Sequence, residues 1–221
     1  PPTIAGMVLV YRGKWLWGSV LTALFVALQI KSNHVQMSYY FLFVMLFMAI
    51  AYGVEAYKAK QLPRFWKATG VLVIAGLIGV ATNLSNLYHT YSYSKETMRG
   101  KSELVYEGDA AQQTSSGLNR DYITQWSYGI GETWTLLVPN FKGGASVPLA
   151  ANETAMKKAN PLYSNIYTQL TQYFGEQPMT SGPVYVGAFV LFLFILGCFI
   201  VKGPMKWALL GATLFSILLS W

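Results

Sequence analysis

Polar residues capable of hydrogen bonding and proton transfer gather in a short turn between two apolar runs. The stretch KSNHVQ carries the amides of Asn33 and Gln36 on either side of His34, close to Lys31. A second group, ATNLSNLYHTY, has polar residues at the three- and four-residue spacing of a helix, with His89 beside them. Polar groups at membrane depth need partners or water. These residues therefore predict a water-filled cavity that opens on one face.

Several kinds of chemistry find no support in the sequence. The chain has 2 His and 1 Cys, and it contains no HExxH, HxH, DxD or CxxC pattern of a metal site. There is no GxSxG nucleophile elbow, and Cys198 lies within the apolar run VYVGAFVLFLFILGCFIV, where it suits packing. YGIGE lacks the third glycine of a dinucleotide fingerprint. We predict no cofactor and no metal-ligating residues, while the need for a divalent metal stays open.

The composition is typical of a membrane protein. Hydrophobic residues make up 53% of the chain and charged residues only 11%, with a mean hydropathy of +0.35. A helix needs about 20 apolar residues to cross a bilayer, and the chain contains several runs of about this length. We therefore predict an all-α polytopic membrane protein with about four to five transmembrane helices. These cover about residues 15–30, 37–57, 68–87 and 184–201, with a truncated one from about 207.

A long loop separates the two groups of predicted transmembrane helices. The helices lie in residues 1–91 and 184–221, and the loop covers residues 92–183. Within the loop, NPLYSNIYTQLTQYFG begins with a capping Asn and a Pro and carries one apolar and aromatic stripe. This pattern predicts an amphipathic helix over residues 161–174. Because the sequence starts without Met and stops inside an apolar run, we expect a fragment of a larger polytopic protein.

The Lys and Arg residues predict the orientation. Positive residues collect in cytoplasmic loops. If successive predicted spans cross the membrane in alternating directions, the short loop on one face contains only Lys31, while the other face contains eight Lys or Arg residues. The segment 92–183 holds seven Lys or Arg against eight Asp or Glu, so we expect it outside the cytoplasm. The net charge of +7 thus reflects topology, and we expect no nucleic-acid partner. The eight residues of the expected cytoplasmic face are Arg12, Lys14, Lys58, Lys60, Arg64, Lys67, Lys202 and Lys206.

Three stretches resemble a known family: SGLNRDYITQWSYGIGETWTLLVPNFKGGAS, QPMTSGPVYVGA and NHVQMSYYF. They are similar to YfhO-type bacterial integral membrane proteins, particularly the form found in Bacteroidetes. Such proteins are similar to the GT-C class of glycosyltransferases, multi-span enzymes that take a sugar from polyprenyl phosphate and transfer it on the outer face. The resemblance implies a multi-pass protein of the bacterial inner (cytoplasmic) membrane. The implied partners are membrane lipid, a polyprenyl-phosphate sugar, and a cell-envelope glycopolymer or protein acceptor.

The resemblance also implies roles for particular residues. The catalytic acid of GT-C enzymes usually lies in a first outer loop that this chain is expected to lack, so the catalytic residue stays unknown. Asp121 and Glu132 are candidate bases, and Glu132 is favoured because flanking glycines allow close backbone approach. Hydrogen-bonding, cationic and aromatic groups suit a sugar phosphate. The predicted substrate-binding residues are Asn33, His34, Gln36, Arg120, Trp126, Tyr128, Trp134 and Lys142.

Other functions stay open. We interpret QWSYGIGETWTLLVPNFKGG as a lid or wall over the outward cavity, but its aromatic residues equally suit anchoring at the membrane interface. A transporter or flippase of lipid-linked sugars needs the same cavity, and Gly76 and Gly79 weakly favour the broken helix typical of that class. A non-enzymatic membrane scaffold needs only the loop and its amphipathic helix.

Overall fold

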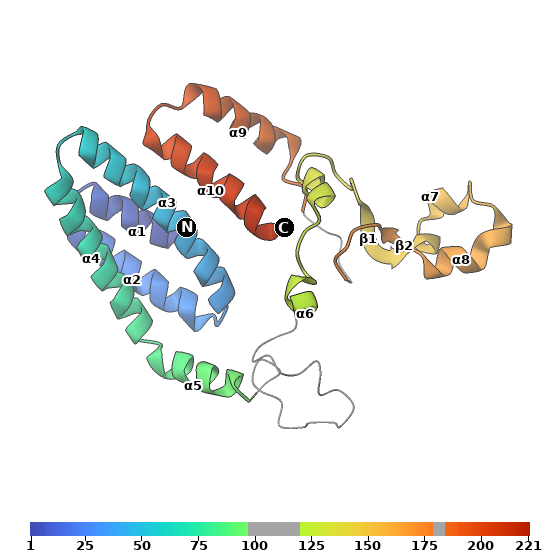
Figure 1. Cartoon of the computed structure of the whole chain (residues 1–221), viewed down its shortest axis with the longest axis horizontal. Coiled ribbons are helices and arrows are strands. Elements are labelled where there is room, and N and C mark those ends of the chain that lie inside the picture. The colour runs from blue at the N-terminus through green and yellow to red at the C-terminus, as the bar shows by residue number, and fades with distance from the viewer. Residues whose placement is uncertain (97–119, 179–183) are drawn as a thin grey trace. The chain divides into compact units, whose positions relative to one another are not determined.

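The computed structural model describes residues 1–96, 120–178 and 184–221 (Figure 1). The described chain is mostly helical, which confirms the predicted helical class, and it adds one two-stranded sheet. Contacts divide the chain into two units. We call Pro1–Leu118 with Val201–Thr213 the helical unit, and Asn119–Ile200 with Leu214–Trp221 the mixed unit.

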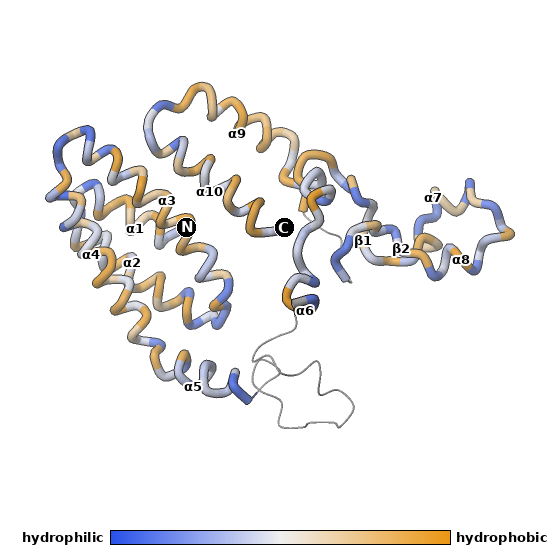
Figure 2. The backbone as a smooth tube through the Cα atoms, viewed as in Figure 1, coloured by the Kyte–Doolittle hydropathy of each residue, from blue (hydrophilic) through white to orange (hydrophobic). Residues whose placement is uncertain are grey.

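Apart from the more polar α5, Leu84–Ser94, the helical unit is built from apolar helices with hydrophilic connections, as the hydropathy colours show along α3 and α4 and at the turn between them (Figure 2). Two of these helices, α3 and α4, are long and apolar enough to cross a membrane, while α1, α2 and α10 are shorter apolar helices. The bounds are α1 Pro2–Tyr11, α2 Trp15–Lys31, α3 Val35–Lys58, α4 Leu62–Ala81, α5 Leu84–Ser94 and α10 Pro204–Ser220, whose last turns belong to the mixed unit.

Helix α2 packs closely against both α1 and α4 at glycine positions. A Cβ atom on Gly18 of α2 would lie 2.7 Å from the carbonyl oxygen of Gly6 on α1. A Cβ atom on Gly79 of α4 would lie 2.7 Å from the carbonyl oxygen of Ala23 on α2. Small residues allow helix backbones to approach in this way, a feature common between helices in membranes. The backbone contacts at these glycines therefore fix the position of α2.

The predicted helix over residues 68–87 is wrong in extent, because the structure divides that region. Helix α4 ends at Ala81, the chain turns, and α5 starts at Leu84. At the turn, the Asn83 side-chain amide donates to the carbonyl oxygen of Ala27 at 3.0 Å and to that of Gly79 at 3.5 Å. Side-chain bonds to backbone compete with helix continuation. Asn83 thus ends α4 and ties it to α2.

The mixed unit combines short helices with a small antiparallel sheet. Strand β1 pairs with β2, with Gly143 opposite Tyr173 and Pro148 opposite Thr171, and the register shifts between these pairs. Helix α9 starts four residues later than the predicted 184, after Gly187 with a φ of +103°. The bounds are α6 Arg120–Thr124, η1 Ile130–Leu136, β1 Gly143–Pro148, η2 Leu149–Ala151, α7 Glu153–Met156, η3 Pro161–Tyr163, α8 Ser164–Gln169, β2 Thr171–Tyr173 and α9 Ala188–Ile200.

The predicted amphipathic helix over residues 161–174 is also wrong in extent. The structure confirms its start, since the Asn160 side chain accepts a hydrogen bond from the backbone N–H of Leu162 at 3.0 Å. The helix nevertheless ends at Gln169, and the chain becomes extended at Leu170, whose carbonyl accepts from the N–H of Leu149 at 2.7 Å. Pairing with a distant strand therefore overrides the helical periodicity of the sequence.

Candidate functional site

The 3-10 helix η1, which forms from the stretch GIGETWTLL, has different kinds of residues on its different sides. Side chains three residues apart lie on one side of such a helix. Glu132 and Thr135 share one side, and both are buried. Gly131 and Trp134 share another side, where the Trp134 side chain is 54% exposed. The helix therefore combines a buried polar side with an exposed aromatic side.

Glu132 is only 1% exposed, and both of its carboxyl oxygens accept hydrogen bonds. The Tyr173 hydroxyl donates to Oε1, and the backbone N–H of Gly129 donates to Oε2 at 2.8 Å. The N–H of Glu132 donates in turn to the Gly129 carbonyl at 2.8 Å, so the first turn of η1 is capped reciprocally. A buried carboxylate requires such donors. Glu132 thereby joins the start of η1 to the end of β2.

Gln177 extends this network to a third segment of the chain. Its backbone N–H donates to the Tyr173 hydroxyl oxygen at 3.3 Å, and its side-chain Nε2 donates to the Trp126 carbonyl at 2.5 Å. Both Tyr173 and Gln177 are buried. We call Trp126, Gly129, Glu132, Tyr173 and Gln177 the Glu132 network. It links the aromatic loop before η1 to β2 and the residues that follow it.

Burial raises the pKa of Tyr173 to about 12, with the hydrogen bond to Glu132 and the negative charges of Glu132 and Glu176 acting in the same direction. A hydroxyl with this pKa keeps its proton throughout the neutral range. Tyr173 therefore remains a donor to Glu132 whenever the mixed unit is folded near neutral pH.

This environment bears on the predicted role of Glu132 as a base. A general base must come within hydrogen-bonding distance of the proton that it removes. Both Glu132 oxygens are instead bonded inside the protein. The placement of Glu132 therefore favours a positioning role, in which it holds η1 and the exposed residues that η1 carries.

A second group of residues combines the exposed side chains of Trp134 and Phe141 with the half-buried Gly131 and Lys142, and we call these four residues the Lys142 face. The Lys142 side chain crosses Gly131, where a Cβ atom would lie 3.1 Å from Cε and 3.4 Å from Nζ. The rings of Trp134 and Phe141 are 6.4 Å apart and both are exposed. The face thus combines an ammonium group that lies against Gly131 with an exposed aromatic pair that includes Trp134 of the same helix.

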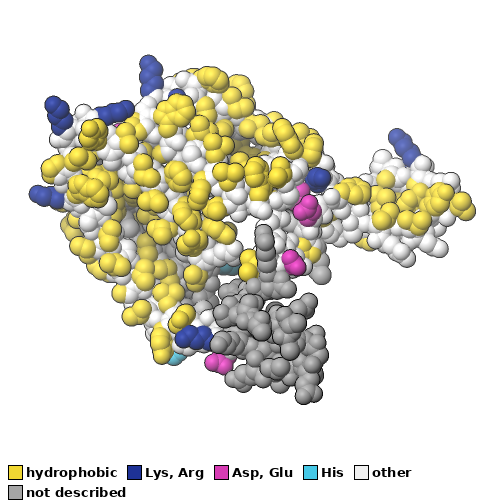
Figure 3. All heavy atoms as spheres, viewed as in Figure 1, with side chains coloured by type: hydrophobic (Ala, Val, Ile, Leu, Met, Phe, Trp, Pro, Cys, Tyr) yellow, Lys and Arg dark blue, Asp and Glu magenta, His cyan; other side chains and the backbone are white. Residues whose placement is uncertain are grey.

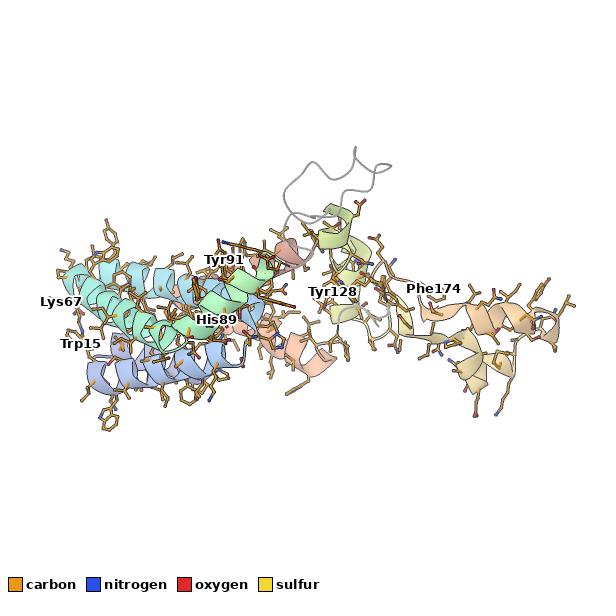
Figure 4. The ribbon with its side chains drawn as sticks, turned by 90° about the horizontal axis from the view of Figure 1, so that it is seen from below. Trp15, Lys67, His89, Tyr91, Tyr128 and Phe174 are labelled. Carbon is orange, nitrogen blue, oxygen red and sulfur yellow. The ribbon has the colours of Figure 1, made fainter. Side chains whose placement is uncertain are left out.

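The other predicted site residues of the mixed unit have different surroundings. The Trp126 side chain is 57% exposed, although its carbonyl belongs to the Glu132 network. Tyr128 is half-buried near the end of the helix α10, where its N–H donates to the Ser220 carbonyl at 2.6 Å (Figure 4). Asp121 is exposed on α6. Arg120 begins α6, and its side chain lies outside the described residues.

The predicted binding residues of the helical unit lie at the connection between α2 and α3. Asn33 has a left-handed backbone with a φ of 60°, and His34 precedes the first residue of α3. Both are exposed, as is Gln36, whose side-chain Nε2 donates to the Tyr40 hydroxyl at 3.3 Å. The turn predicted from KSNHVQ is therefore present, and its polar side chains face solvent.

Sequence reasoning missed Tyr173 and Gln177. The periodicity of residues 161–174 places Tyr173 on the stripe of an amphipathic helix, and Gln177 follows that segment as one polar residue among several. Their roles depend on contacts with residues 41 and 51 positions away, for which the sequence carries no local signal.

Within the parts of the chain that the structure describes, no three His, Cys, Asp or Glu side chains gather closely enough to hold a metal ion. The chain matches no family model, no curated protein and no solved structure.

Proposed function

We propose that this chain is part of a multi-pass bacterial membrane protein of the YfhO type that acts as a GT-C-like glycosyltransferase. In this proposal the mixed unit lies outside the cytoplasm and binds a polyprenyl-phosphate sugar. The sugar is then transferred to a cell-envelope acceptor. The length and apolar composition of α3 and α4 support the membrane location.

The Lys142 face is the observation that carries the proposed sugar-phosphate binding. The Trp134 and Phe141 rings offer flat apolar surfaces for one face of a sugar. The Lys142 ammonium, lying along Gly131, offers a positive charge for a phosphate. In the structure, no described carboxylate forms an ion pair with Lys142, so its charge is available to a ligand.

The Glu132 network supports the proposed sugar-phosphate binding because it holds η1 in a fixed position. Binding is stronger when the binding groups are held in place before the ligand arrives. The network fixes the first turn of η1, and η1 carries both Gly131 and Trp134. We therefore assign Glu132 to positioning the Lys142 face and leave the catalytic residue unassigned.

Binding of radiolabelled polyprenyl-phosphate sugars to the protein in lipid nanodiscs tests this proposal. We expect Trp134→Ala and Lys142→Gln each to weaken binding by about tenfold, since each removes an interaction of roughly 1–2 kcal/mol. The matched controls are Trp17→Ala and Lys157→Gln, which change an exposed Trp of the helical unit and an exposed Lys that is not part of the Lys142 face. These controls should bind as the unchanged protein does.

The same preparation separates the proposed activity from its alternatives. Transfer of label to a cell-envelope acceptor supports the glycosyltransferase. Movement of the lipid-linked sugar between leaflets without transfer would indicate a transporter instead. If the folded protein binds none of the radiolabelled polyprenyl-phosphate sugars, the proposal is contradicted, and the non-enzymatic membrane scaffold remains as the alternative function.

A further inference from the structure

The helical unit contains a charged pocket that the proposed sugar chemistry does not use. The pocket has a volume of about 550 Å³, within the ~300–1,000 Å³ range of small-molecule sites. It lies where α1 ends, α3 ends and α4 begins, and Met205 of α10 contributes to its wall. The side chains that matter for its chemistry are Tyr11, Arg12, Tyr52, Glu55, Gln61 and Arg64.

Two arginines line this pocket from different helices. Arg12 follows the last residue of α1, and Arg64 lies in the first turn of α4. Gly13, with a φ of +93°, leaves room for Arg64, since a Cβ there would lie 2.8 Å from Nη2. The guanidinium of Arg64 therefore lies beside the residue that follows Arg12. Among the described residues neither arginine forms an ion pair.

An aromatic wall makes the pocket rigid. The rings of Tyr11 and Tyr52 stack at 4.3 Å, and those of Tyr11 and Phe65 stack at 5.7 Å. The Tyr11 hydroxyl also hydrogen-bonds to the Thr69 hydroxyl at 3.1 Å. These contacts join α1, α3 and α4, and all three rings line the pocket. The pocket is thus formed before any ligand binds.

The net charge of the pocket matches that of a monovalent anion. Glu55 is the one carboxylate among the lining residues, and two arginines leave a net charge of +1. Arginine binds phosphate oxygens through paired N–H donors, and the Gln61 amide can add a further donor. A phosphodiester, which carries one negative charge, would neutralise the pocket.

The surroundings indicate that this phosphodiester belongs to a lipid. Trp15 and Lys67 lie at the same end of the α1–α4 helices, with His89 and Tyr91 far from that end (Figure 4). Trp15 and Trp66 are both exposed, and Trp is enriched at membrane interfaces. The visible face of these helices is largely hydrophobic, with Lys and Arg at its edge (Figure 3). Basic pockets between membrane helices are known lipid headgroup sites.

We propose that this pocket binds the phosphate of an anionic phospholipid headgroup between Arg12 and Arg64. The site is separate from the proposed sugar-binding face and does not depend on the sugar chemistry. Its occupant would hold the ends of α1, α3 and α4 together, because the lining residues come from all three helices.

Native mass spectrometry of the detergent-solubilised protein with phosphatidylglycerol measures this binding. We expect one saturable site per chain, and binding about tenfold weaker in Arg12→Gln and in Arg64→Gln, as each removes charge-assisted hydrogen bonds. Glu55→Gln should bind more tightly, because it removes the opposing negative charge. Lys67→Gln is the matched control, since it removes an exposed positive charge that does not line the pocket, and its affinity should change by less than about twofold.

Each other result overturns part of the proposal. If Lys67→Gln lowers the affinity for phosphatidylglycerol as much as the arginine variants do, the lipid binds through general surface charge. If neither arginine variant lowers the affinity, the pocket is not the binding site. If soluble glycerol phosphate binds as tightly as phosphatidylglycerol, the natural occupant of the pocket is a free phosphate compound and not a lipid. Weaker binding of phosphatidylglycerol by Glu55→Gln would contradict the proposal, because the removed carboxylate would then not oppose the charge of the bound phosphate.

A measurement on the unchanged protein does not depend on whether the variants fold. Phosphatidylglycerol must bind saturably, and phosphatidylcholine, whose quaternary amine offsets its phosphate charge, must bind more weakly. Equal binding of the two lipids contradicts the proposal. Arg12→Lys and Arg64→Lys keep the charge while losing the paired donors, so they should bind more weakly than the unchanged protein if they fold.

Discussion

Replacing Tyr173 with Phe is expected to destabilise the mixed unit by about 2 kcal/mol. The substitution keeps the ring but removes the hydroxyl that donates to Glu132 Oε1. The free energy of unfolding falls because a buried charged acceptor is left without its partner, which costs roughly 1–3 kcal/mol or more. Hydrogen exchange of the backbone amides in η1 and β2 measures the local stability. Tyr167→Phe is a matched control, because no hydrogen bond of its hydroxyl is part of the Glu132 network.

A second substitution isolates the contribution of the charge. In Glu132→Gln the acceptor is neutral, so adding Tyr173→Phe to this variant should cost about 1 kcal/mol less than in the unchanged protein. Strictly additive effects of the two substitutions would contradict the bond between Tyr173 and Glu132.

The same bond has a signature at alkaline pH. The pKa of Tyr173 is raised to about 12 in the folded protein, against about 10 in an unfolded chain. A raised pKa means that the stabilisation is complete below pH ~10 and is lost as the pH rises from about 10 to 12. The difference in unfolding free energy between the unchanged protein and Tyr173→Phe should shrink over that range. A difference that stays constant through pH 12 would contradict this assignment.

Replacing Gly79 with Leu is expected to separate α4 from α2 and to destabilise the helical unit by roughly 3 kcal/mol. A Cβ atom at Gly79 would lie 2.7 Å from the Ala23 carbonyl and 2.9 Å from Val26 Cβ, so the two backbones must move apart. Overpacking of this kind costs about 1–3 kcal/mol, and the displaced α2 also loses contacts with α1. Thermal unfolding in detergent or nanodiscs measures the loss.

Gly76→Leu provides the matched control for this change. It places the same side chain on the same helix three residues earlier, where a Cβ atom would meet nothing within 4 Å. We expect this variant to be as stable as the unchanged protein or slightly more stable, because Leu has a higher helix propensity than Gly. Equal destabilisation by the two substitutions would show that α2 and α4 do not pack through Gly79.

The helices of the helical unit were predictable because their signal is local. The apolar runs from residue 15 and from residue 37 correspond within about two residues to α2 and α3. The break after Ala81 was not predicted, because it depends on the contact of Asn83 with Ala27, 56 positions away. Hydropathy reports the length of an apolar run, and it carries no information about such a contact.

The candidate site was predictable only in its outer part. Trp134 and Lys142 stand out in the sequence by residue type, and the structure places both on the Lys142 face. Glu132 also stands out, but its burial requires Tyr173 as a donor, and the periodicity of residues 161–174 points to a helix at that position. Long-range strand pairing decided the actual conformation, and no local pattern encodes it.

The most direct test of the proposed location is thiol labelling with a membrane-impermeant maleimide on intact cells. In a Cys198→Ala background, Asn165→Cys in α8 and Lys67→Cys in α4 each present one exposed thiol. We predict that Asn165→Cys is labelled on intact cells and that Lys67→Cys is labelled only after the membrane is opened. Labelling of Lys67→Cys but not Asn165→Cys on intact cells, or of both positions equally, would contradict a mixed unit that lies outside the cytoplasm.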